Sequence, residues 1–171
     1  IHTYSHFLPY LQPLMTTLAL KSYQQAALDT LAEFARTAQQ KGPAMAFGEL
    51  VGRPYNPDPF GEVPCVCLRI PTGGGKTLRA AHAVRVLATG WRATDAPVTV
   101  WLVPSDTIRS QTLKALQTTG HPYHEALEAH YGADVQVCVL EDLANIAPTD
   151  WGQRAGGVVA TIQSFRIDDT D

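Results

Sequence analysis

The stretch Arg69-Ile-Pro-Thr-Gly-Gly-Gly-Lys-Thr77 decides the fold expected for this chain. It follows an apolar run, Cys65 to Ile70, that predicts a β-strand, and it leads into a segment from Lys76 to about Ala88 that predicts a helix. Glycines between a strand and a helix can turn their backbone N–H groups inward around an anion, and the positive end of the helix dipole adds to the attraction. The sequence therefore predicts a loop that binds phosphate.

The residue types in this loop suit the phosphates of a nucleotide. A lysine after the last glycine can reach the β- and γ-phosphates, and the hydroxyl of the next threonine can ligate Mg²⁺. The predicted nucleotide-binding residues are Thr72, Gly73, Gly74, Gly75, Lys76 and Thr77. Lys76 and Thr77 are also the candidate catalytic residues, Thr77 is the candidate metal ligand, and ATP with Mg²⁺ is the expected cofactor. Ile70 stands where the usual pattern has its first glycine, so a plain glycine turn before a lysine is the alternative.

Strand-like and helix-like patterns alternate along the rest of the chain. Apolar runs predict strands at 98–103, 135–140 and 157–162, and helical spacing predicts helices at 20–38, 106–117 and 121–131. This alternation predicts one α/β domain with a parallel sheet and helices on both faces. Ser105 is the expected N-cap of the helix at 106–117. Residues 42–64 hold many prolines and glycines and predict a long irregular connection.

Composition excludes several classes of protein. The 171 residues are 45% hydrophobic and 17% charged, which is typical of a globular chain, and no apolar run is long enough for a membrane span. Residues 1–120 carry 11 Lys and Arg against 7 Asp and Glu, and residues 121–171 carry 2 against 9. A broad basic surface for nucleic acid is therefore excluded, and any such binding must use a local track. Cys65, Cys67 and Cys138 lie in apolar runs, which indicates buried thiols in a reducing cytoplasm.

Four segments, in order along the chain, resemble a known group of proteins. Pro71 to Thr77 resembles motif I of superfamily-two helicases, which include the DEAD/DEAH-box helicases and the helicase subunits of type III restriction enzymes. Leu20 to Gln24 looks like the upstream adenine-recognising segment, with Lys21 where arginine is commoner. Val103 to Gln111 looks like motif Ia, and Ala160 to Phe165 looks like motif Ic. The whole resembles the type III restriction helicases most closely.

The resemblance assigns roles to residues outside the loop. Gln24 would recognise adenine, because its amide carries a donor and an acceptor that match N7 and the N6 amino group of the base. An exposed polar helix residue is the alternative for Gln24, and Tyr23 would either stack on the base or pack in the core. The implied nucleic-acid contacts, with plain capping as the alternative, are Pro104, Ser105, Thr161, Gln163 and Ser164. DNA is favoured over RNA as the partner.

The resemblance also implies parts that this sequence does not contain. A RecA-like ATP-binding lobe needs an acidic pair, normally Asp-Glu, after a strand, and the sequence stops at Asp171, a few residues past the motif Ic match. We therefore expect residues 20–171 to be the first, incomplete RecA-like lobe. An extension at 1–19 would precede it, with Met15 as a candidate natural start. A second RecA-like lobe is implied elsewhere, and a methyltransferase or nuclease module in the full protein stays open.

Glu141 and Asp142 follow the predicted strand at 135–140 and are the one alternative to that acidic pair. An acidic cap on the next turn is favoured over a metal-holding role, because the order is Glu-Asp and the pair precedes the motif Ic match. Three functions stay open. The favoured one is the ATP-binding lobe of an ATP-dependent DNA helicase or translocase. The others are a nucleotide- and nucleic-acid-binding fragment with no turnover of its own, and a different P-loop phosphotransferase.

Overall fold

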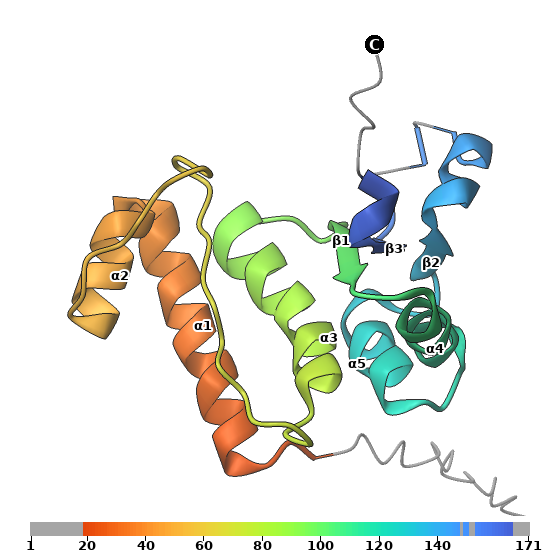
Figure 1. The fold of residues 1–171 in the computed structure, drawn as a ribbon, viewed down its shortest axis with the longest axis horizontal. Helices are drawn as coiled ribbons and strands as arrows, with labels where there is room; N and C mark the ends of the chain where they lie inside the picture. Colours follow the sequence, from red (N-terminus) through yellow and green to blue (C-terminus); the bar gives the residue numbers. More distant parts are fainter. Residues whose placement is uncertain (1–18, 148, 151–152, 166–171) are drawn as a thin grey trace, which may run out of the picture.

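The computed structural model describes residues 19–147, 149–150 and 153–165, so nearly all of the predicted extension at 1–19 lies outside the described residues. Its helices are α1 (Ser22–Lys41), α2 (Pro43–Val51), α3 (Lys76–Leu87), η1 (Ala88–Arg92), α4 (Asp106–Gln117), α5 (Pro122–Tyr131), η2 (Leu140–Asn145) and η3 (Ile162–Phe165). Its strands are β1 (Val98–Val103), β2 (Gln136–Val139) and β3 (Gly156–Thr161). None of the described helices is both long enough and apolar enough to span a membrane. Figure 1 shows α1 and α2 on one side of α3 and the strands on the other.

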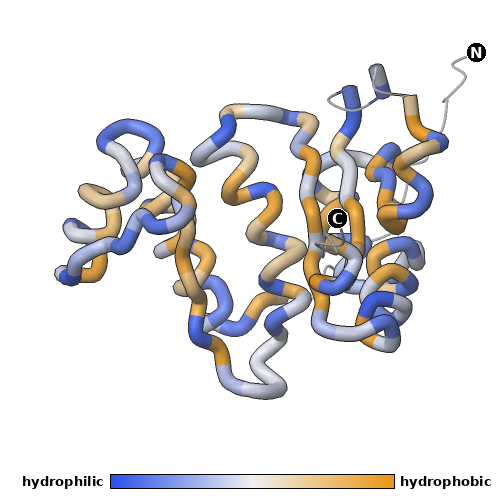
Figure 2. Tube along the Cα trace, turned by 45° about the horizontal axis from the view of Figure 1, so that its top comes forward, coloured by the Kyte–Doolittle hydropathy of each residue, from blue (hydrophilic) through white to orange (hydrophobic). Residues whose placement is uncertain are grey.

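The strands form a parallel sheet, which confirms the α/β class. Its order is β1-β3-β2, with Val100 of β1 opposite Val158 of β3 and Cys138 of β2 opposite the same valine. These strands are among the most hydrophobic stretches of the chain (Figure 2). Parallel strands need crossover connections, and α4 and α5 supply the one from β1 to β2. The sequence therefore predicted these three strands and the helices that join β1 to β2.

The core lies between the sheet and three helices. Leu78 of α3, Leu116 of α4 and Leu127 of α5 form one buried cluster with Val159, and Trp101 packs against it. The side chains of Cys138 and Val158, which alternate with those of the first face, are 6% and 2% exposed. On this second face Val98, Val100 and Leu102 of β1 are 51%, 55% and 51% exposed, so the prediction of helices on both faces is met in full on one face only.

A second apolar cluster joins α1 and α2. Phe34 and Ala38 of α1 pack against Ala46 of α2, and Trp91 of η1 and Val66 close the cluster. Residues 42–64 were predicted to be irregular throughout, and that prediction was wrong for the part that forms α2. Pro43 is the first helical residue, where a missing N–H costs no hydrogen bond, so the proline starts the helix instead of preventing it.

The strand predicted at Cys65 to Ile70 is absent from the described sheet, and this prediction was wrong. The segment is extended and runs beside α1 (Figure 1). Its Val66 packs on the cluster of α1 and α2, and the Cys65 N–H donates to the Tyr55 hydroxyl at 2.7 Å. A strand needs a neighbouring strand for its backbone hydrogen bonds, and no described strand pairs with this segment, which packs on helices through Val66 and leaves most of its residues exposed. Cys65 and Cys67 are consequently exposed, contrary to expectation, whereas Cys138 is buried as predicted.

Candidate nucleotide and nucleic-acid site

The predicted phosphate loop forms the turn that leads into α3. The Gly74 N–H donates to the Pro71 carbonyl at 3.0 Å, and Gly75 is the residue before the first helical turn. The first N–H groups of a helix have no partner inside the helix, so α3 directs free donors toward this loop. No described residue accepts a hydrogen bond from the Gly75 N–H either. The loop therefore presents backbone donors at the positive end of a helix, which is the arrangement that binds anions.

Two of the loop glycines cannot be replaced without displacing their neighbours. A Cβ on Gly75 would lie 2.5 Å from Nε2 of Gln24, and Gly75 has a φ of 75°, which disfavours side chains. A Cβ on Gly74 would lie 2.8 Å from the Ile70 side chain and 2.9 Å from the Pro71 carbonyl oxygen. The absence of side chains here lets the loop turn tightly and pack against Gln24 of α1 and Arg79 of α3.

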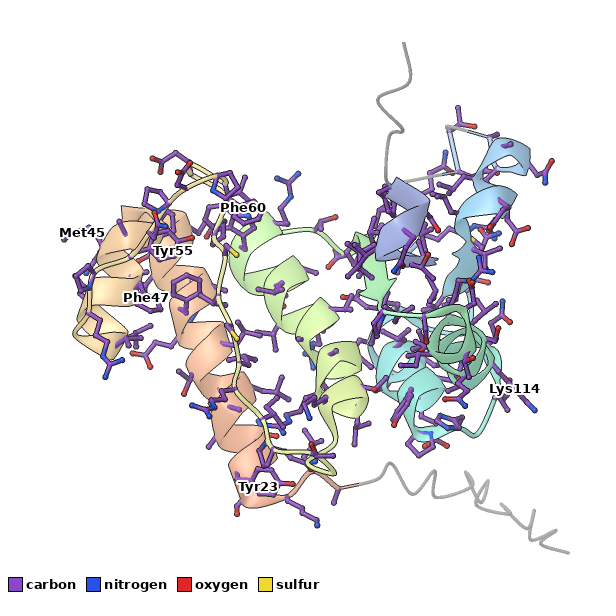
Figure 3. The ribbon with its side chains drawn as sticks, viewed as in Figure 1. Tyr23, Met45, Phe47, Tyr55, Phe60 and Lys114 are labelled. Carbon is purple, nitrogen blue, oxygen red and sulfur yellow. The ribbon has the colours of Figure 1, made fainter. Side chains whose placement is uncertain are left out.

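Three side chains converge on the carbonyl oxygen of Gly74. Nη2 of Arg79 donates to it at 2.8 Å, Nε2 of Gln24 at 3.0 Å, and the Tyr23 hydroxyl lies at 3.4 Å. Gln24 and Tyr23 belong to α1, about 50 residues earlier in the chain, and Arg79 belongs to α3. Figure 3 shows Tyr23 at the end of α1 that meets this loop. The structure thus brings the predicted adenine-recognising residue into direct contact with the predicted phosphate loop.

Gln24 uses both ends of its amide within the protein. Its Oε1 accepts from the Lys21 N–H at 2.9 Å while its Nε2 donates to Gly74, and the residue is 6% exposed. Adenine recognition by the same amide would need its second N–H and its second lone pair, so that role stays a prediction. Tyr23 is 45% exposed, so it does not pack in the core. Its ring lies 5.3 Å from the Arg79 guanidinium carbon instead.

The two candidate catalytic residues open α3. Lys76 is exposed, and its Nζ donates to the Pro71 carbonyl at 3.2 Å, which keeps the ammonium group beside the loop. Thr77 follows in the first turn and is partly exposed, and Thr72 is exposed on the loop itself. A polyphosphate fits this donor set, because a cationic ammonium, a hydroxyl and unpaired N–H groups lie together at the positive end of a helix.

Arg79 is the residue of this site that the sequence did not reveal. It is 3% exposed, it donates to Gly74, and its Nε has no hydrogen-bond partner among the described residues. A weak signal exists, because helical side chains point back toward the helix N-terminus and Arg79 lies in the first turn of α3. That direction places its guanidinium at the loop. Without the structure, however, nothing distinguishes Arg79 from a solvated arginine on a helix.

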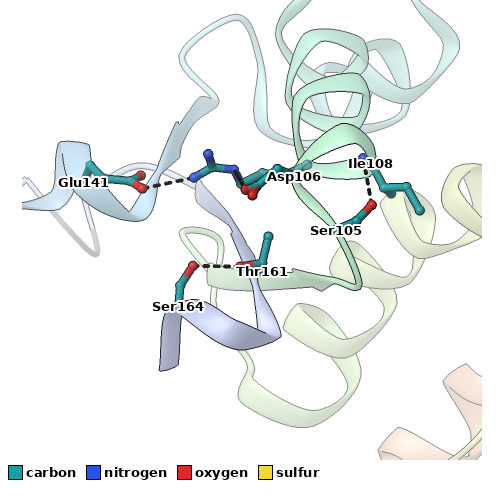
Figure 4. A network of polar contacts seen from close by, with 7 residues as sticks. Ser105, Asp106, Ile108, Glu141, Thr161 and Ser164 are labelled. Atoms are coloured by element: carbon teal, nitrogen blue, oxygen red, sulfur yellow. Dashed lines mark hydrogen bonds and ion pairs between the residues drawn. The ribbon is translucent and has the colours of Figure 1, made fainter. Parts of the chain in front are cut away.

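The predicted nucleic-acid contacts gather at one edge of the sheet. Val103 is paired with Thr161, so the residues after these two parallel strands emerge side by side. Ser105 Oγ accepts from the Ile108 N–H at 3.4 Å, and Thr161 Oγ1 lies 2.9 Å from Ser164 Oγ (Figure 4). Ser105 is therefore the predicted N-cap of α4. Pro104, Ser105, Gln163 and Ser164 are exposed, and Thr161 is buried.

Glu141 and Asp142 are both engaged near this edge. Glu141 pairs with Arg109 at 3.0 Å, and Asp142 Oδ2 accepts from the Val139 N–H at 3.2 Å, as the acidic cap requires. A backbone hydrogen bond and the bond from Arg109 hold the pKa of Glu141 below its usual value. Neither carboxylate contacts the phosphate loop through a hydrogen bond or ion pair in the described ranges. The geometry thus favours capping over metal binding for this pair.

Comparison with known proteins agrees with the motifs. Residues 17–169 match the family described as "Type III restriction enzyme, res subunit". No curated protein and no solved structure matches the sequence. Domains of this family are helicase-like and ATP-binding, they generally use ATP and Mg²⁺, and they interact with nucleic acid in general. The parallel α/β sheet is consistent with part of a RecA-like domain. Because the match spans most of its length, this chain belongs to the family of type III restriction enzyme res subunits.

Proposed function

We propose that this chain is the ATP-binding lobe of an ATP-dependent DNA helicase or translocase. The observation that carries the proposal is the glycine loop before α3, whose Gly74 carbonyl is held by residues of α1 and α3. The contacts that hold the loop use the Gly74 carbonyl oxygen, so they leave the N–H group of Gly75 available to a ligand. Family membership supports ATP as that ligand, and it supports a partner that is a nucleic acid.

Each loop residue has a place in this proposal. The N–H groups of Gly73, Gly74 and Gly75 would surround the phosphates together with Thr72, Lys76 would turn from the Pro71 carbonyl to the β- and γ-phosphates, and Thr77 would ligate Mg²⁺. Mg²⁺ bound with the nucleotide neutralises charge on the β- and γ-phosphates. Gln24 would select adenine. These assignments make the loop and the start of α1 one nucleotide site.

The sheet edge after β1 and β3 is the proposed DNA contact. The N-terminus of α4 and the exposed polar groups around it suit a phosphate, because sequence-independent contacts use hydroxyls, amides and helix N-termini. Pro104, Ser105, Thr161, Gln163 and Ser164 form this edge. Asp106 adds a negative charge in the first turn, and Arg109, which lies 3.2 Å from Asp106 and 3.0 Å from Glu141, offsets only part of the charge of these two carboxylates. We further propose that a second RecA-like lobe works with this one in a cytoplasmic protein.

A second candidate is ATP and DNA binding without turnover by these residues. Hydrolysis needs a carboxylate for Mg²⁺ and water, and the best placed pair in the sequence, Glu141 and Asp142, is engaged with Arg109 and Val139. The same observation weakens the third reading, a different P-loop phosphotransferase, since that enzyme would use one of these carboxylates for its metal.

One experiment separates these functions. ATP binding and ATP hydrolysis are measured on the purified chain, with and without single-stranded DNA. Binding without hydrolysis supports an ATP-binding lobe that needs a partner lobe. Hydrolysis that survives Glu141→Gln and Asp142→Asn would show that another acid acts. Failure to bind ATP at any concentration up to the millimolar range would contradict the proposed function.

A further inference from the structure

The carbonyl of Gly74 receives more donors than one oxygen needs. Arg79, Gln24 and Tyr23 all lie within 3.4 Å of it, and Gly74 itself is buried. In a planar trans peptide, the C=O of one residue and the N–H of the next point in opposite directions. Holding the Gly74 oxygen toward α1 and Arg79 therefore points the Gly75 N–H to the opposite side, where no described residue accepts from it. The side chains fix the direction of a donor that the loop offers to a ligand.

Arg79 is an unusual residue to bury at such a place. It is 3% exposed and forms no ion pair with any carboxylate of the described residues. A buried cation without a counter-ion is costly, and a carbonyl and an aromatic ring compensate only part of that cost. Its Nε also lacks a partner. The uncompensated positive charge lies directly behind a loop that suits a polyphosphate, where a bound anion would interact with it favourably.

Gln24 is divided between Gly74 and its predicted base. One N–H of Nε2 is directed at Gly74 and Oε1 accepts from Lys21, so a base must use the second N–H and the second lone pair of an amide that is 6% exposed. If the amide turns toward adenine to do so, its bond to the Gly74 carbonyl weakens. Arg79 gives the shortest of the three bonds, at 2.8 Å, and it comes from α3 instead of α1. It would remain in place when Gln24 turns.

We propose that Arg79 is a positioning residue of the phosphate loop, which holds the Gly74 carbonyl so that the loop keeps its anion-binding form whether or not Gln24 turns to a base. The proposal rests on the nucleotide-binding function proposed above. It predicts that Arg79 affects ligands with and without an adenine equally, whereas Gln24 affects ligands with an adenine more strongly than a bare phosphate chain. Inorganic tripolyphosphate, which has the chain and no base, separates the two.

The test measures the affinities of Mg·ATP and inorganic tripolyphosphate by calorimetry for the wild type, Arg79→Met, Arg79→Lys and Gln24→Ala. Losing one charge-assisted hydrogen bond to the loop should weaken binding of both ligands to Arg79→Met about tenfold or more. Arg79→Lys, which keeps a charge and a donor, should fall between Arg79→Met and the wild type. Gln24→Ala should weaken binding of ATP more than binding of tripolyphosphate. The matched control is Arg85→Met, an exposed arginine on the same helix, which should bind both ligands like the wild type.

A second readout excludes a merely structural effect. The amide resonance of Gly75, followed by ¹H–¹⁵N NMR, should move in Arg79→Met and stay in place in Arg85→Met. A folded Arg79→Met with wild-type affinity for both ligands overturns the inference while leaving ATP binding intact. If Arg79→Met does not fold, a folded Arg79→Lys with wild-type affinity and an unmoved Gly75 resonance has the same meaning. No ATP binding by the wild type would instead overturn the proposed function, and this inference with it.

Discussion

The phosphate loop and the sheet edge after β1 and β3 obtain their shapes in different ways. The loop is held by side chains from α1, and the bond from Gln24 to Gly74 spans 50 residues of sequence. At the sheet edge the polar side chains bond within three residues, as Ser105 does with Ile108 and Thr161 with Ser164. The loop therefore depends on tertiary structure, whereas the edge depends on local caps and on the strand register. Changes at the loop should have large effects on ligand binding, and changes at the edge should have small ones.

The largest effect should come from filling the loop. In Gly75→Ala the new Cβ would lie 2.5 Å from Gln24 Nε2 at a φ of 75°, so the Gln24 amide must leave the Gly74 carbonyl and the backbone at position 75 is strained. We expect Mg·ATP binding to fall by about a hundredfold or more, since several donors lose their directions together. Calorimetric titration with Mg·ATP measures this loss directly.

Gly48→Ala is the matched control for that variant. Gly48 lies in α2, and a Cβ there meets no atom within 4 Å. Replacing a glycine inside a helix by alanine should leave ATP binding unchanged and stabilise the fold by up to about 1 kcal/mol. Equal ATP affinities for Gly75→Ala and the wild type would show that the loop does not bind phosphate in this form.

The next effect concerns the base. Gln24→Ala should remove the preference for ATP over GTP, since the amide that matches adenine is lost, and it should cost about tenfold in ATP affinity. Competition between the two nucleotides measures the preference, and circular dichroism checks the helices. If Gln24→Ala prefers ATP as strongly as the wild type does, Gln24 does not recognise the base and only supports the loop through Gly74.

A smaller effect is expected at the sheet edge. Ser105→Ala removes the N-cap of α4, which should lower the free energy of unfolding by about 1 kcal/mol, while ATP affinity stays unchanged. Affinity for single-stranded DNA should fall a few-fold, by about the worth of one phosphate hydrogen bond. Chemical denaturation and fluorescence anisotropy measure the two quantities. A loss of ATP affinity as large as that of Gly75→Ala would mean that loop and edge are coupled.

The smallest effect should come from Glu141→Gln. Its ion pair with Arg109 is exposed, and such pairs contribute little to stability. Because the pKa of Glu141 is lowered in the folded chain, its contribution is present above the ordinary carboxyl pKa and is lost as the pH falls through the lowered value. The melting temperatures of the wild type and Glu141→Gln should therefore differ slightly at pH 7 and converge in acid. Loss of ATP binding in Glu141→Gln would restore the metal-holding alternative for this residue.

Two apolar runs show what the sequence could and could not predict about the fold. Residues 98–103 and 65–70 both predict strands, and only the first forms one. Pattern and propensity describe a segment that can pair, but pairing also needs a neighbouring strand, and Val66 packs on helices instead. The start of α2 at Pro43 was missed for a related reason, since a proline either ends a helix or begins one depending on its position.

The candidate site also contains a part that the sequence predicted and a part that it did not. The loop, its helix and the cap at Ser105 follow from short stretches of sequence, and all of them were found. The contacts of Arg79, Gln24 and Tyr23 with Gly74 join segments that only the folded chain brings together. A sequence gives the residue types for such contacts but not their partners, so Arg79 was missed and the present partners of Gln24 were not foreseen.

The most direct test of the account is the affinity of the purified chain for Mg·ATP, compared between the wild type, Lys76→Ala and Lys114→Ala. Both lysines are exposed, but Lys76 lies at the loop and Lys114 lies on α4, far from Tyr23 in Figure 3. We expect saturable binding by the wild type and by Lys114→Ala. For Lys76→Ala we expect a loss of at least about tenfold, the worth of one charge-assisted hydrogen bond to phosphate. Unchanged affinity in Lys76→Ala would contradict the phosphate-loop assignment on which the proposed function rests.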